Sequence, residues 1–181
     1  MLFRSQECQI KAAFLTKLSS DVGLFETILF KTGSDQTRIS RMSQHLARLA
    51  HSAKALGIPF DLLGANHLLG ETSKKLRSDY EHRVRLDLGP DGELSISSAP
   101  LEALSPSVKL FWANEILAGE YSLDQLTMRS QNPLLFHKVT QRSIYDAAWQ
   151  KAVSLGGFDA LFRSEEHTSE LQSRVDISYA V

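Results

Sequence analysis

Three polar side chains that could bind an anion lie three and four residues apart in the segment 40–56. His45, Arg48 and Ser52 fall outside the apolar stripe of this segment, and at helical spacing they would occupy neighbouring turns. A guanidinium on a rigid helix is suited to two-pronged recognition of a phosphate or a carboxylate. The alternative is a solvated helix face, where such residues are usually found.

A second candidate for chemistry is Lys138, which stands between the apolar residues 134–136 and a helix expected to begin near Gln141. A lysine partly removed from water could act as a nucleophile toward a carbonyl group or as a proton carrier. The alternative is an ordinary solvated surface charge. We expect the neighbouring His137 to be structural, because successive side chains of an extended segment point to opposite sides.

Other common sites of chemistry have no support in the sequence. The three histidines His51, His67 and His82 have no cysteine or carboxylate partners at ligand spacing, so no metal site is predicted. No glycine-rich phosphate loop and no nucleophile-elbow motif is present.

The elements that would carry Arg48 are predicted from periodicity and turn residues. Residues 24–31 are rich in aromatic and β-branched side chains and indicate a largely buried strand. Met42, Leu46, Leu49, Ala53 and Leu56 line one face of a helix that should end at Gly57, before Pro59. A weaker helix is predicted over 66–80, and the alternation over 84–88 and 94–96 around the turn 89–92 predicts a hairpin.

The elements around Lys138 are predicted in a second part of the chain. Residues 101–106, with Pro100 and Pro106 at the ends, form the expected interdomain connection. A strand is expected over 108–112, a polar stretch over 127–133, a helix from about Gln141 to Gly156, and a further strand over 158–162. The expected organisation is a connector-like segment 1–22, a small α+β domain 23–100, the connection 101–106, a lysine-bearing domain 107–162 and a final segment 163–181.

Composition narrows the class of protein. The 181 residues are 43% hydrophobic and 23% charged, and 20 basic against 21 acidic side chains give a net charge of −1, so no long-range field would attract nucleic acid or an anionic membrane. The lone Cys8 has no intrachain disulfide partner, the N-terminus has no signal-peptide core, and no stretch approaches the length of a membrane span. We therefore expect a cytoplasmic globular protein.

Three motifs in order resemble one family. GLFETILF at 23–30, HLARLAHSAKALGIPFD at 45–61 and FHKVTQRSIYDAA at 136–148 are similar to the class IV aminotransferases, which are pyridoxal 5′-phosphate (PLP) enzymes of fold type IV. The resemblance implies a two-domain α+β fold. It implies that Lys138 is the catalytic Schiff-base lysine and proton shuttle, and that Arg48 binds the cofactor phosphate. Tyr145 could face the cofactor, but an aromatic residue in an amphipathic helix is more often part of the core.

Within this family the motifs most resemble aminodeoxychorismate lyase of folate biosynthesis. ECQIKAAFL at 7–15 is similar to the connector of bifunctional para-aminobenzoate synthases, so an aminodeoxychorismate synthase component, fused or separate, is an expected partner. The lyase converts 4-amino-4-deoxychorismate into 4-aminobenzoate and pyruvate, and family members are commonly homodimers. Val139 and Gln141 depart from the commonest pattern of the lyase fusions, and a branched-chain or D-amino-acid transaminase is the alternative.

The resemblance stops after Phe162. Residues 163–173 read RSEEHTSELQS, which resembles the in-frame translation of a sequencing-library adapter, so we expect 163–181 to be non-native and the second domain to be truncated. The alternative is a natural acidic tail with a helix start at Ser164. The family places a glutamate for the pyridine nitrogen and a phosphate-binding segment beyond this point. Without them we expect the 181-residue chain to be inactive. A non-catalytic structural fragment is the further alternative.

Overall fold

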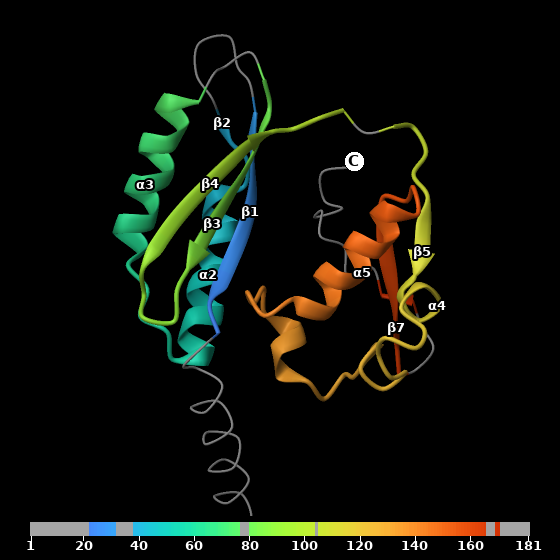
Figure 1. The fold of residues 1–181 in the computed structure, drawn as a ribbon. Helices are drawn as coiled ribbons and strands as arrows, with labels where there is room; N and C mark the ends of the chain where they lie inside the picture. Colours follow the sequence, from blue (N-terminus) through green and yellow to red (C-terminus); the bar gives the residue numbers. More distant parts are fainter. Residues whose placement is uncertain (1–21, 32–37, 77–79, 104, 166–168, 171–181) are drawn as a thin grey trace, which may run out of the picture. The chain divides into compact units, whose positions relative to one another are not determined.

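The computed structural model describes residues 22–31, 38–76, 80–103, 105–165 and 169–170. The connector-like motif at 7–15 and Cys8 lie outside these residues. The chain forms two compact units, one of residues 1–101 with 137–141 and the other of residues 102–136 with 142–181. Both units combine helices with sheets, as the labelled elements of Figure 1 show, which confirms the predicted α+β class.

The first unit contains an antiparallel sheet with strand order β2-β1-β3-β4. Its central strand β1 (Leu24–Lys31) pairs with β2 (Arg38–Ile39) on one side and with β3 (His82–Leu88) on the other, and β4 (Leu94–Pro100) closes the sheet. The hairpin of β3 and β4 keeps one register from His82 opposite Pro100 to Leu88 opposite Leu94. The predicted strand 24–31 and the predicted hairpin are thus confirmed, although both hairpin strands are longer than their apolar alternation.

Two helices cover one face of this sheet (Figure 1). Helix α2 (Met42–Leu56) ends as predicted, because Gly57 adopts the left-handed conformation, with φ of 71°, that terminates many helices. Helix α3 (Leu62–Lys75) differs from the prediction of 66–80. It starts earlier because the side chain of Asp61 accepts a hydrogen bond from the Leu63 amide and caps the helix. Leu62 and Leu63 are exposed, so apolar periodicity could not reveal that start.

The core of the first unit lies between α2 and the sheet. Alternate β1 side chains face this core and are almost fully buried, as are the β3 side chains opposite them and the inner face of α2. They are Leu24, Ile28 and Phe30 of β1, Val84, Leu86 and Leu88 of β3, and Leu46, Leu49 and Ala53 of α2. Glu26 shares the β1 face of Leu24 and Ile28, and it is the one acid among the buried residues of that face within the described part of the chain.

The second unit is built around β7 (Asp159–Ser164). Strands β5 (Leu110–Trp112) and β6 (Thr127–Met128) flank β7 in parallel, and the two-residue strand β8 (Ser169–Glu170) pairs with it antiparallel. The remaining elements are α4 (Ala113–Ile116), the 3-10 helix η1 (Pro133–Phe136) and α5 (Ser143–Ser154).

Several boundaries in this unit correct the sequence predictions. The predicted strand 108–112 begins only at Leu110, and the predicted helix start near Gln141 falls at Ser143. Residues Pro133–Phe136, for which no helix was predicted, form η1, and the Asn132 side chain accepts a hydrogen bond from the Leu134 amide at its start. The predicted strand 158–162 runs on to Ser164, so no helix begins there.

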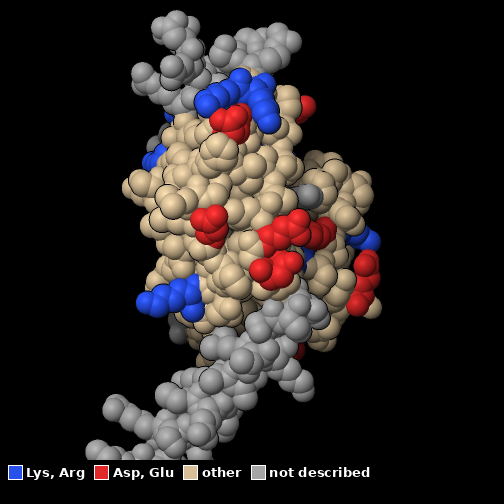
Figure 2. All heavy atoms as spheres, turned by 90° about the vertical axis from the view of Figure 1, so that its left-hand side faces the viewer, with Lys and Arg blue, Asp and Glu red and all other residues tan. Residues whose placement is uncertain are grey.

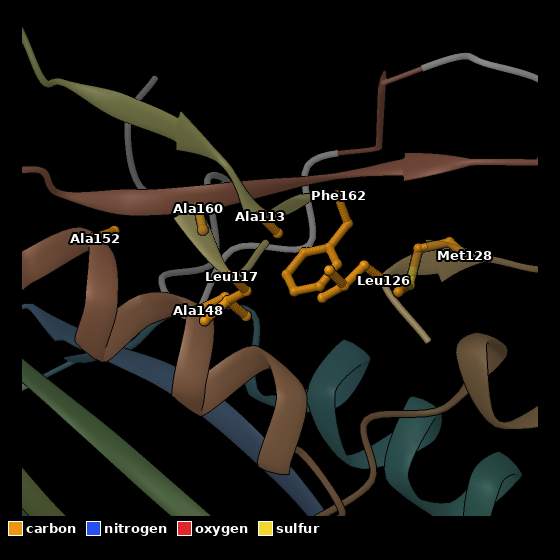
Figure 3. Packing of buried hydrophobic residues seen from close by; sticks show 8 residues of the cluster. All are labelled: Ala113, Leu117, Leu126, Met128, Ala148, Ala152, Ala160 and Phe162. Carbon is orange, nitrogen blue, oxygen red and sulfur yellow. The ribbon is translucent and has the colours of Figure 1, made fainter. Parts of the chain in front are cut away.

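Small side chains bring the elements of the second unit close together. Four alanines from α4, α5 and β7 are at most 1% exposed, and the ring of Phe162 lies beside Leu126, as Figure 3 shows. Alanines at such contacts let helix and strand backbones approach, which favours dense packing. The buried cluster consists of Ala113, Leu117, Leu126, Met128, Ala148, Ala152, Ala160 and Phe162.

Surface charge and hydropathy agree with the composition. The face shown in Figure 2 carries small groups of basic and acidic side chains separated by uncharged surface. Among the described residues, no helix is both long enough and apolar enough to cross a bilayer.

Candidate active site

The segment that carries Lys138 belongs to the first unit, although the sequence analysis placed it in the domain 107–162. It lies along the N-terminal end of β1 like a short added strand, with an antiparallel bridge between Leu24 and Val139. The Phe25 amide donates to the Lys138 carbonyl at 2.9 Å, and the Thr140 amide donates to the Gly23 carbonyl at 2.9 Å. Backbone pairing to β1, which sequence periodicity does not encode, therefore fixes the position of the lysine.

Alternation along this added strand sends neighbouring side chains to opposite faces of the sheet. His137 lies on the helix side, where a hydrogen bond of 2.9 Å joins its Nδ1 to the Ser52 hydroxyl of α2. Burial, and after it the charge of His51, lowers the pKa of His137. Lys138 lies on the other side, with Nζ 5.9 Å from the centre of the Phe25 ring. The opposite orientation of these two side chains matches the sequence expectation.

Glu26 is the centre of a polar cluster on the helix side of β1. Its side chain is 1% exposed, and Arg48 grips both of its oxygens, with Nε donating to Oε1 and Nη2 donating to Oε2, each at 2.6 Å. His45 Nδ1 lies 2.9 Å from Oε2 and acts as the donor, since an ionised carboxylate can only accept. The Arg48 side chain is nevertheless 48% exposed, so an anion in solvent can reach it.

The charge state of Glu26 links Arg48 and Lys138. Burial by itself would raise the pKa of Glu26, but the hydrogen bonds from Arg48 and His45 and the charges of Arg48 and Lys138 outweigh it and lower the pKa. The carboxylate is therefore ionised at neutral pH. Arg48 contacts this acid directly, whereas Lys138 lies on the other face of the sheet and acts on it only through its charge.

The other candidate site residues from the sequence lie in different places in the structure. His45 joins Arg48 at Glu26, whereas Ser52 holds His137. Tyr145 belongs to the second unit, where its ring lies 4.8 Å from that of Phe162 and its hydroxyl contacts the Met128 sulfur at 2.9 Å. Its packing is that of a core residue. Among the described residues, no group of three potential metal ligands is present.

Glu26 was not among the functional residues predicted from the sequence. The sequence feature that could have identified Glu26 is an acidic residue in the middle of a predicted strand, flanked by apolar and β-branched residues. A charge in such a strand is costly unless the fold supplies partners, so it should prompt a search for a basic residue on the covering element.

The lowered pKa of Glu26 predicts how stability depends on pH. An acid whose pKa is lower in the folded state stabilises the fold above its ordinary value of 4.5, and this contribution is lost as the pH falls through the folded-state pKa. Urea unfolding between pH 7 and pH 3 should show this decrease in unfolding free energy, and the decrease should be smaller in the Glu26→Gln variant. Glu71→Gln is the matched control, because the Glu71–Lys74 pair is solvated and worth little. Equal pH profiles for the two variants would contradict this role of Glu26.

Gly23 should be essential for docking the lysine segment. A Cβ at this position would lie 2.8 Å from the Leu88 carbonyl oxygen and 3.3 Å from the Thr140 side chain, so Gly23→Ala must displace backbone. We expect a loss of about 1–3 kcal/mol in unfolding free energy. The control is Gly70→Ala in α3, where no atom lies within 4 Å and the change should stabilise by up to about 1 kcal/mol. Urea unfolding measures both, and a neutral Gly23→Ala would contradict the argument.

The donor set of the first unit fits the cofactor that the sequence resemblance implies. Lys138 supplies an amine that can bond to an aldehyde carbon, and Arg48, held by Glu26, supplies a guanidinium that can bind a phosphate. The exposed edge of Arg48 and the intermediate burial of Lys138 leave both accessible to a small molecule.

Sequence comparison defines the family. Residues 23–173 match the amino-transferase class IV family over most of the chain, so this protein belongs to the class IV aminotransferases. Members of the family depend on PLP, which confirms the cofactor prediction. A search of curated proteins found no match.

Solved structures support the fold. The chain is similar to a "Putative amino-acid aminotransferase" from Mesorhizobium loti, with 28% identity and a TM-score of 0.65, over 81% of this chain and 64% of the other. It is similar to a "Putative 4-amino-4-deoxychorismate lyase" from Legionella pneumophila, with 23% identity and a TM-score of 0.62, over 84% of this chain and 56% of the other. A hypothetical aminotransferase from Mycobacterium tuberculosis in its PLP-bound form has 20% identity and a TM-score of 0.57, with coverages of 84% and 55%.

The extent of these matches matters for function. This chain spans less than two thirds of the length of each of the three proteins. Branched-chain aminotransferases are also among the similar structures. The fold is therefore common to lyases and transaminases, and it does not distinguish between them.

Proposed function

We propose that this chain is part of a PLP-dependent aminodeoxychorismate lyase, which converts 4-amino-4-deoxychorismate into 4-aminobenzoate and pyruvate for folate biosynthesis. The observation that carries the PLP assignment is that the Lys138 segment pairs with β1, the same strand whose Glu26 holds Arg48. The lyase assignment is supported by the motif FHKVTQR at 136–142 and by the connector-like ECQIKAAFL at 7–15.

Each residue has a distinct role in the proposed reaction. PLP supplies an electron sink for the pair of electrons released when a proton leaves the substrate. Lys138 would hold the cofactor through its aldehyde carbon, and its Nζ, when free, would remove and return substrate protons. Arg48 binds the cofactor phosphate with charge-assisted hydrogen bonds. Pairing of 138–140 to β1 holds the lysine backbone during these steps.

A branched-chain or D-amino-acid transaminase is the second candidate. It is supported by the 28% identity to the Mesorhizobium loti protein, the highest identity among the similar structures described above. The lyase releases pyruvate from one substrate, whereas a transaminase needs an oxo acid to accept the amino group.

One experiment separates the two candidates. Protein restored to its native sequence beyond residue 162 is given 4-amino-4-deoxychorismate without any oxo acid and, separately, branched-chain or D-amino acids with 2-oxoglutarate. Formation of pyruvate and 4-aminobenzoate in equal amounts in the first reaction supports the lyase. Glutamate formation in the second reaction, with none of the first, would reject the lyase in favour of the transaminase.

The cellular setting belongs to the same proposal. We place the protein in the cytoplasm, as a homodimer that works with an aminodeoxychorismate synthase component, fused or separate. Sequencing the source DNA across codon 162 tests the expectation for 163–181. A frame that continues into a glutamate and a phosphate-binding segment supports a non-native end, and a frame that encodes RSEEHTSELQS contradicts it.

A further inference from the structure

Arg48 is held in place by Glu26, a buried acid whose negative charge would not bind the cofactor phosphate. Glu26 faces α2 from the centre of β1 and takes hydrogen bonds from Nε and Nη2 of Arg48, two of the five N–H donors of a guanidinium. Both contacts are 2.6 Å long, which is short even for charge-assisted hydrogen bonds. The plane of the guanidinium is therefore fixed by a carboxylate in the core.

Glu26 is itself fixed. It sits on the central strand of the sheet with 1% exposure, and His45, one turn before Arg48 on α2, donates to the same oxygen that Nη2 contacts. The contact of 3.3 Å between Arg48 Nη2 and His45 Nδ1 brings the two basic side chains together over one carboxylate oxygen. Strand and helix thus meet at a rigid polar junction within an otherwise apolar core.

We propose that Glu26 is a positioning residue for cofactor binding, which orients the exposed edge of Arg48 toward the PLP phosphate. A free arginine side chain has many rotamers, and each must be given up when it binds an anion. Glu26 fixes the rotamer before the phosphate arrives, so the binding energy of the phosphate is not spent on ordering Arg48. This inference rests on the proposed role of Arg48 and is independent of the choice between lyase and transaminase.

The negative charge of Glu26 also reduces the local positive potential, and this reduction opposes phosphate binding. The test must therefore separate the effect of geometry from the effect of charge. Glu26→Asp keeps the negative charge but withdraws the carboxylate by one methylene, too far for the two short contacts. Arg48→Lys keeps the positive charge and leaves Glu26 intact, but an ammonium cannot make the planar two-pronged contact.

The readout is the dissociation constant for PLP and for pyridoxal, which lacks the phosphate, measured by absorbance with the full chain. We expect Glu26→Asp and Arg48→Lys each to weaken PLP binding about tenfold and to leave pyridoxal binding within about twofold of wild type, because only the phosphate contact is disturbed. In an Arg48→Ala background, Glu26→Asp should have no further effect on PLP binding, since the residue acts through Arg48.

The outcomes are distinct. If wild type binds PLP more tightly than pyridoxal but Glu26→Asp binds PLP as wild type does, the positioning role is overturned and Arg48 keeps its proposed role. If Arg48→Ala binds PLP as wild type does, the proposed role of Arg48 fails, and this inference fails with it. If Glu26→Asp unfolds and so loses binding of both ligands, the PLP affinity of the Arg48→Lys variant is the deciding measurement. A wild-type affinity for PLP in that variant overturns the inference, and selective loss of PLP supports it.

Discussion

In protein restored to its native sequence beyond residue 162, Lys138→Ala is expected to abolish covalent attachment of PLP and to lower turnover by about a thousandfold or more. Under the proposed mechanism the variant lacks both the amine that bonds to the cofactor aldehyde and the group that moves protons, and proton transfer by a positioned side chain contributes about 10²–10⁴-fold. The measurement is borohydride reduction in the presence of PLP, followed by mass analysis of the peptide that contains residue 138, together with the product assays described above.

Two controls make the result specific. Lys138→Arg keeps a positive charge beside Phe25 and near Glu26 but cannot bond to the aldehyde, so it should be as inactive as the alanine variant while remaining folded. Lys151→Ala removes an exposed lysine of α5 that pairs with Glu120 at 3.0 Å, and it should retain full activity. A reduced adduct at another lysine, with activity preserved in Lys138→Ala, would remove Lys138 from the mechanism.

Leu49→Ala should produce the largest loss of stability among the variants considered. Leu49 is 1% exposed, on the face of α2 that packs against the sheet, and it follows Arg48 directly. Truncation of a buried leucine removes apolar contact and leaves a cavity, which costs about 2–5 kcal/mol. We expect this decrease in urea unfolding at constant m-value, together with weaker PLP binding, because α2 carries Arg48.

The control for Leu49 is Leu63→Ala in α3. Leu63 is 80% exposed, so its truncation removes little buried area and should change the unfolding free energy by less than about 0.5 kcal/mol. If the two leucine variants were equally stable, the assignment of the core between α2 and the sheet would be wrong.

Local patterns were sufficient for the elements that surround the cluster. Strand β1, helix α2 and the β3–β4 hairpin follow from a run rich in aromatic and β-branched residues, a helical stripe and a Gly-Pro-Asp-Gly turn. These signals act within a few residues, so a single sequence reveals them. Helix α3 was misplaced because its start depends on the Asp61 cap and on exposed leucines. The 3-10 helix η1 was not predicted, because its start depends on a hydrogen bond to the Asn132 side chain.

The amino-acid sequence by itself determined the family, through three motifs in a fixed order, and with it Lys138 and Arg48 as candidates for the cofactor site. Tertiary structure decided what those residues do to one another. Pairing of 138–140 to β1 joins the lysine to the first unit across more than a hundred residues of chain, and Glu26 meets Arg48 across 22. No local propensity encodes such contacts, because a buried charge is stable only where the fold brings its partners within hydrogen-bonding distance.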